Sequence, residues 1–330
     1  MNASMMGSEV LKLVRSGVDV ASIHAQARHP FRIFLCGDAG LVAEFRAVLL
    51  SGHTGGEVPF DAAATLETLV PGRKAIIDNT ARAVVFLGRA GDREGAEFRT
   101  LLDMQLPTLA VTVDPSSATS GPAAPPEKAA IGDYVVPALE PGALRQHVFP
   151  HLVHTCGGVE VAVARRLPIL REHCAAKLTR DCAKRSLTIA AASAVIDHVP
   201  LAGIVLGAVA SAGDMVAITG LQMALVLQIG SCYGRDPDLQ RVWELLPVVG
   251  TGFGWRALSR ELSGFIPIAG IAIKGAIAYA GTIVVGEGVM FYYEHGRQMS
   301  AADAAKLYED AKSSAMTFAR EMVARLRNRK

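Results

Sequence analysis

Several features with clear functional meaning are missing or scarce in this 330-residue chain. Its five cysteines form no CxxC pair and no Cys/His spacing typical of a zinc site: Cys36, Cys156, Cys174, Cys182 and Cys232. Aromatic residues make up 6% of the chain and the formal net charge is +2, so the composition does not favour a nucleic-acid partner. We therefore expect buried, reduced thiols, no metal site and no nucleic acid.

A secretory signal is also not expected, because charged Glu9, Arg15 and Asp19 leave no room for a long apolar segment near the start. This places the bulk of the chain on the cytoplasmic side. Hydrophobic residues amount to 51%, which is enough for a sizeable core. They are concentrated after Leu187, so the two halves of the chain are expected to differ in structure.

The N-terminal part alternates short apolar runs with helical patterns. The pattern predicts a helical extension within residues 1–30 and an α/β domain with a parallel sheet over residues 31–156. Buried strands are expected at 31–36, 83–87, 108–113 and 134–136. Helices are expected at 10–27, 41–50, 61–70, 94–104 and 142–153.

The stretch FRIFLCGDAGLVAEF (31–45) has the layout of a phosphate-binding loop, with a strand, a small glycine turn and a helix. Gly37 and Gly40 are the candidate cofactor-binding residues of this degenerate loop. The motif GxxxxGK[ST], counted from Gly37, would need glycine, lysine and a hydroxyl where Val42, Ala43 and Glu44 stand. We therefore expect a tight strand-to-helix turn, weak or absent nucleotide binding, no cofactor, and no catalytic or metal-binding residue.

Further segments carry a family resemblance. ARAVVFLGRAGD, TLAVTVDPSS and DYVVPALEPGAL resemble the later strands of a translation-factor-type GTPase domain of the Era or Ras kind. Residues 113–116 do not make the guanine motif NKxD, no DxxG occurs in residues 51–82, and a proline precedes Ala138 and Leu139 where the serine-alanine loop would be. The resemblance implies a pseudo-GTPase domain.

The second half begins with a basic helical connector over residues 157–187, in which Pro168 is expected to kink or split the helix. A glycine-rich, apolar, all-α domain follows over residues 188–297, with hydrophobic tracts at 199–234 and 262–293. Residues 298–330 read as an amphipathic helix that starts with a capping box at Ser300. Asp214 and Lys274 interrupt the two tracts, so each is expected to find a partner, and they could pair with each other.

This half resembles the family called domain of unknown function 697, which follows Era-like GTPase domains and occurs in YcjF-like inner-membrane proteins of bacteria. The residues that carry the resemblance are GDMVAITGLQMALVLQIGSCYG (213–234), VVGTGFGWRALSREL (248–262) and FIPIAGIAIKGAIAYAGTIVVGEGVMFYYE (265–294). The resemblance implies association with a GTPase-like partner domain and often with a membrane, and it implies no catalytic role.

Together these features predict a noncatalytic scaffold or partner protein at the cytoplasmic membrane. Each tract could cross the bilayer or enter it as a helical hairpin, which would leave both basic flanks on the cytoplasmic side. Membrane lipid and a protein partner or second copy are the expected partners. Two alternatives stay open: an atypical GTP-binding protein or GTPase, and a soluble homo-oligomer with a helical core.

Overall fold

The computed structural model describes residues 18–52, 59–70, 76–92, 105–121, 131–196, 203–240 and 270–327. Side chains are described over the same ranges except 192–196, 203–215, 270–274 and 318–327. The chain folds into two compact units. The α/β unit comprises Ala25–Lys177 with Cys232–Gly234, and the helical unit comprises Met1–His24, Leu178–Ser231 and Arg235–Lys330.

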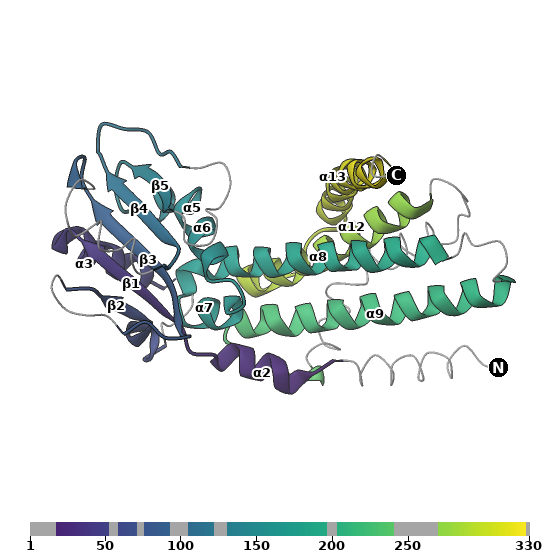
Figure 1. The fold of residues 1–330 in the computed structure, drawn as a ribbon. Coiled ribbons are helices and arrows are strands. Elements are labelled where there is room, and N and C mark those ends of the chain that lie inside the picture. The colour runs from purple at the N-terminus through teal and green to yellow at the C-terminus, as the bar shows by residue number, and fades with distance from the viewer. Residues whose placement is uncertain are drawn as a thin grey trace. The chain divides into compact units, whose positions relative to one another are not determined.

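The α/β unit contains a five-stranded, all-parallel sheet in the order β2-β1-β3-β4-β5 (Figure 1). Its strands are β1 (Arg32–Gly37), β2 (Leu66–Thr68), β3 (Ala81–Gly88), β4 (Thr108–Val113) and β5 (Ile131–Val136). The middle residues of β1 and most of β3 are buried on both faces, which explains their continuous apolar runs. The predicted α/β class with a parallel sheet is thus confirmed.

The helices of this unit are α2 (Val20–Arg28), which begins in the helical unit, α3 (Ala39–Leu49), α5 (Pro141–Arg145), α6 (Val148–Thr155) and α7 (Glu160–Arg166). Helix α3 packs on β1 and β3, and α6 packs on β3 and β4. A short 3-10 turn, η3 (Pro168–Leu170), separates α7 from α8 (Arg171–Ile196), so Pro168 splits the connector as predicted. The helix predicted at 142–153 is instead the pair α5 and α6.

The predicted helix at 61–70 is wrong. A 3-10 turn, η1 (Ala62–Thr65), leads there into the edge strand β2. Strand β2 pairs with β1 in the register Ile33↔Leu66 to Leu35↔Thr68, and Arg32 donates to the Glu67 carboxylate at 2.6 Å. This pairing overrides the helix propensity of the alanine-rich sequence. The helix predicted at 94–104 lies outside the described residues.

The helical unit is formed by the later part of α8, α9 (Gly203–Cys232), α12 (Gly270–His295) and α13 (Ala301–Arg327) (Figure 1). Helices α12 and α13 are antiparallel, because Ala276 packs with Ala315 while Ala280 and Val284 pack with Tyr308. Ser300 starts α13 with the predicted capping box: its hydroxyl accepts from the Asp303 backbone N–H at 3.1 Å. A helical C-terminal part is therefore confirmed.

Candidate functional site

The carboxyl ends of β1 and β3 form the best-placed ligand position of the α/β unit. Strand β1 connects to β2 on one side, and the chain then crosses to β3 on the other side of β1. Open parallel sheets bind ligands at such a switch point, outside the carboxyl ends of the strands. The candidate loop at Gly37 and Gly40 lies here.

The turn after β1 is one residue long, because β1 ends at Gly37 and α3 begins at Ala39. Gly37 has a φ of +107°, and a Cβ at this position would lie 2.0 Å from the Leu87 carbonyl oxygen of β3. The next backbone N–H, of Asp38, donates to the same carbonyl at 2.8 Å. Glycine is required at residue 37 for close contact with β3, and no loop remains that could surround a phosphate.

Asp38 occupies the helix N-terminus that a phosphate would otherwise use. Its Oδ1 accepts from the Leu41 backbone N–H at 2.9 Å, which makes it the N-cap of α3. Gly40 lies in the first turn, where an added Cβ would be 3.2 Å from Asp38 Oδ1. The protein's own carboxylate therefore satisfies the positive end of the helix and repels a second anion.

The three residues that stand at the diagnostic motif positions point away from phosphate chemistry as well. Val42 is buried in the core, whereas Ala43 and Glu44 are exposed on α3. A buried valine stands at the position of the second glycine. Neither exposed residue supplies the lysine ammonium or the magnesium-binding hydroxyl of a phosphate loop.

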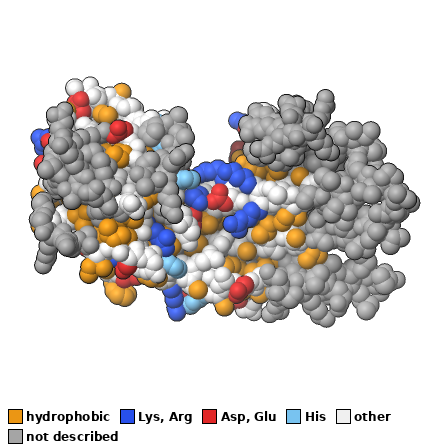
Figure 2. All heavy atoms as spheres, in the orientation of Figure 1, with side chains coloured by type: hydrophobic (Ala, Val, Ile, Leu, Met, Phe, Trp, Pro, Cys, Tyr) orange, Lys and Arg blue, Asp and Glu red, His pale blue; other side chains and the backbone are white. Residues whose placement is uncertain are grey.

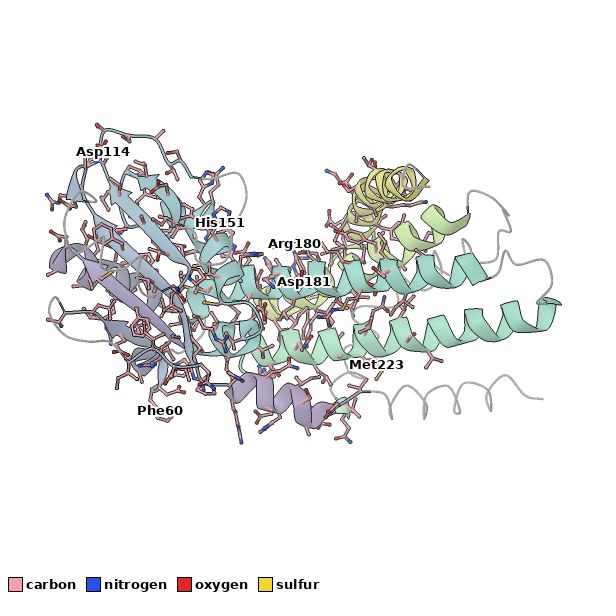
Figure 3. All side chains as sticks on the ribbon, viewed as in Figure 1. Phe60, Asp114, His151, Arg180, Asp181 and Met223 are labelled. Carbon is pink, nitrogen blue, oxygen red and sulfur yellow. The ribbon has the colours of Figure 1, made fainter. Side chains whose placement is uncertain are left out.

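The loops after β3 and β4 add two further carboxylates. Asp92 accepts from the Arg89 backbone N–H at 2.6 Å, directly after β3. Asp114, which follows β4 and is labelled in Figure 3, accepts from Ser117 Oγ at 2.6 Å and from Ser116 Oγ at 2.7 Å. These hydrogen bonds hold the pKa of Asp114 below its ordinary value, and the bond from Ser117 has the largest effect. Each carboxylate is used to fix its own turn.

The described part of this edge is thus acidic and internally hydrogen-bonded. Among the residues the structure describes, no group of three His, Cys, Asp or Glu side chains is placed to hold a metal ion. Around the described turns, these carboxylates disfavour a further anion such as a nucleotide phosphate.

Other titratable groups of the α/β unit are sealed in its interior. Tyr134 Oη and His151 Nδ1 are 2.7 Å apart, and both residues are buried; His151 is labelled in Figure 3. Burial raises the pKa of Tyr134 and lowers that of His151, which His147 and His154 lower further. A neutral phenol and a neutral imidazole are the stable forms, so this pair serves as a core hydrogen bond.

Buried Glu160 forms an ion pair at 2.7 Å with the partly buried Lys177. The thiols of Cys156 and Cys174 are also buried, and burial raises the pKa of Cys156 to about 12 and that of Cys174 well above its ordinary value. A thiol in this state is not a nucleophile at neutral pH. All five cysteines are buried and none is in a disulfide, so the expected burial of the thiols is confirmed.

The helical unit has a polar layer across three helices. Gln222 Nε2 of α9 donates to Thr282 Oγ1 of α12 at 3.1 Å, and Ser186 Oγ of α8 lies 3.1 Å from the same oxygen. All three side chains are buried. Buried hydrogen bonds of this kind fix the relative register of helices rather than perform chemistry.

Glycine lets α8 and α12 approach very closely in the same unit. A Cβ on Gly286 would lie 2.3 Å from Thr179 Oγ1, and one on Gly275 would lie 3.3 Å from Leu187 Cγ. Residues 179–187 of α8 therefore lie beside residues 275–286 of α12. Glycine at these two positions therefore permits close helix packing.

Within the described residues, one helical segment, Gly275–His295, is long and apolar enough to cross a membrane, and 72% of its most apolar stretch is buried. The apolar stretch Val216–Cys232 of α9 is shorter. The predicted pairing of Asp214 with Lys274 and the family-like motif at 248–262 lie outside the described side chains or residues.

Sequence reasoning selected Gly37 and Gly40 but missed Asp38, whose signal was present as an N-cap residue directly before an apolar helix. The full chain was compared with protein-family models, with curated proteins and with solved structures, and none of the three comparisons finds a match. Its function must therefore follow from its own residues.

Proposed function

We propose that this chain is a noncatalytic, membrane-associated scaffold at the cytoplasmic face of a membrane, with its α/β unit acting as a pseudo-GTPase platform. One observation carries the proposal: the carboxylate of Asp38 caps α3 at the switch point of the sheet. A site built to bind phosphate leaves those backbone N–H groups open for the ligand. Here the Leu41 N–H already donates to the Asp38 carboxylate, and the turn between β1 and α3 is too short to wrap a phosphate chain.

The membrane part of the proposal is supported by the apolar segment Gly275–His295 and by the resemblance of the second half to a GTPase-associated family. The packing of α8 beside α12 bears on how the protein contacts the membrane. Arg180, Lys184 and Arg185 are exposed on α8, beside residues 275–286 of α12. If the packed unit crossed the bilayer, these cations would face hydrocarbon at a cost of about 2.5–3.5 kcal/mol each, or about 7.5–10.5 kcal/mol together. Contact from the bilayer surface avoids this cost.

Calorimetry on the full-length chain tests the noncatalytic part. We expect no saturable heat with GTP or ATP in the presence of magnesium, and no phosphate release above the protein-free blank. Asp38→Asn is the matched control, because asparagine keeps the cap without the charge and should still not bind nucleotide. A dissociation constant in the micromolar range or tighter for the wild-type chain would instead identify an atypical GTP-binding protein.

Fractionation without detergent tests the membrane part. The full-length chain should sediment with membranes after high-speed centrifugation. If the chain remains in the supernatant, the buried state of α12 reflects a soluble helical core, and the size of the soluble particle would show whether that core is shared between copies.

A further inference from the structure

Helix α8 has two contrasting faces within the helical unit. One face is buried against its neighbours and carries Thr179, Cys182, Ala183, Ser186, Leu187 and Ala190. The opposite face exposes Arg180, Lys184 and Arg185. Figure 2 shows the basic side chains gathered over α8, where Figure 3 labels Arg180 and Asp181.

The three cations are available for an external partner. Among the described residues, none of Arg180, Lys184 and Arg185 makes an ion pair or a side-chain hydrogen bond. Asp181 is the acidic residue next to them along the helix, so the local charge remains positive at +2. Unpaired charge on one face provides an electrostatic attraction that salt would screen.

Apolar side chains lie close to these cations. Ile189 is partly exposed and follows Arg185 by four residues, which places both on one face of α8. Hydrophobic side chains lie beside the basic ones over α8 and α9 in Figure 2. Basic residues mixed with apolar ones suit the boundary between lipid headgroups and acyl chains. A nucleic-acid surface would favour aromatic side chains for stacking, which this face lacks among its described residues.

We propose that the exposed face of α8, formed by Arg180, Lys184 and Arg185, docks on anionic phospholipid headgroups while α12 stays packed inside the helical unit. This rests on the membrane association proposed above and specifies the surface that makes it. The protein then lies on the bilayer rather than across it. Charged side chains stay in the headgroup region, where the potential of anionic lipid attracts them.

Vesicle sedimentation with the purified full-length chain tests this surface. We expect binding to phosphatidylcholine vesicles that contain phosphatidylglycerol, little binding to phosphatidylcholine alone, and release at high salt. Each basic residue near an anionic bilayer contributes about a fivefold gain in affinity, so R180Q/K184Q/R185Q should bind on the order of 100-fold more weakly. A carbonate wash should release the wild-type chain.

The control variant R28Q/R297Q/K306Q removes the same charge from exposed positions outside α8. It should bind anionic vesicles like the wild type, and circular dichroism should show both triple variants folded. Wild-type affinity in the α8 variant, or equal losses in both variants, would overturn the docking face while leaving membrane association intact. Retention after the carbonate wash would overturn surface binding in favour of crossing.

Two other outcomes separate this inference from the function on which it rests. If the wild-type chain binds neither vesicle, membrane association itself fails. If it ignores both vesicles but is held by a polyglutamate resin through the α8 cations, the face belongs to an acidic protein, and the lipid assignment is wrong.

Discussion

The close contact between α8 and α12 can be tested by adding one methyl group at Gly286. A Cβ there would lie 2.3 Å from Thr179 Oγ1, 2.4 Å from Thr179 Cγ2 and 2.8 Å from Thr179 Cβ. Cβ atoms in proteins essentially never come within 3.0 Å of such atoms, so α8 and α12 must separate locally by about 0.7 Å. Overpacking of this kind costs about 1–3 kcal/mol.

Replacing glycine by alanine in a helix also stabilises the helix by up to about 1 kcal/mol, which would hide part of that cost. Gly220→Ala is the matched control, because Gly220 lies in α9 and an added Cβ there meets nothing within 4 Å. We expect Gly286→Ala to be less stable than Gly220→Ala by about 1–3 kcal/mol in urea denaturation, provided that the helical unit unfolds in a single transition.

Thr179→Ala then provides the rescue. It removes Oγ1 and Cγ2, the two closest atoms, and Oγ1 has no hydrogen-bond partner in the described structure. Gly286→Ala/Thr179→Ala should therefore be more stable than Gly286→Ala alone. The coupling free energy between the two substitutions should be about 1–2 kcal/mol. Equal stability of the two Gly→Ala variants would refute the close contact, and with it the placement of the α8 cations beside α12.

Three further changes test the α/β unit by denaturation. Asp38→Ala should cost about 1 kcal/mol through loss of the helix cap, whereas Asp38→Asn should cost less than half of that, and equal costs would argue against capping. Lys177→Met should cost about 3–5 kcal/mol of stability because it leaves Glu160 buried without its ion-pair partner. Glu160→Gln/Lys177→Met should recover much of that loss. A larger loss in the double variant than in Lys177→Met would refute the pairing. Hydrogen bonds from Thr80 lower the pKa of Asp78 from 3.8 to about 2. Ionised Asp78 therefore stabilises the folded state fully above about pH 4, and this contribution is lost as the pH falls through about 2. Asp78→Asn should remove this acid-sensitive component, and an unchanged pH profile would count against it.

Local chemistry determined much of the α/β unit. The apolar runs that became β1, β3 and β4 could be located because strands buried on both faces have no polar alternation. Pro168 ended a helix because proline lacks an N–H, and Ser300 began one because its hydroxyl can cap the first turn. The absence of the phosphate-loop lysine and hydroxyl, where Ala43 and Glu44 stand, could likewise be seen from the sequence alone.

Tertiary structure alone decided the features that depend on partners distant in sequence. Strand β2 exists because β1 offers it a hydrogen-bonding edge and Arg32 offers a counter-ion for Glu67, whereas the alanine-rich sequence directly before β2 favours a helix. The need for glycine at residue 37 comes from the Leu87 carbonyl, 50 residues away. The segment of α8 that carries the exposed cations lies beside the apolar segment of α12 because Gly286 admits Thr179 so closely. Hydropathy counts each helix separately, so it could identify an apolar segment but not the charged helix packed alongside it.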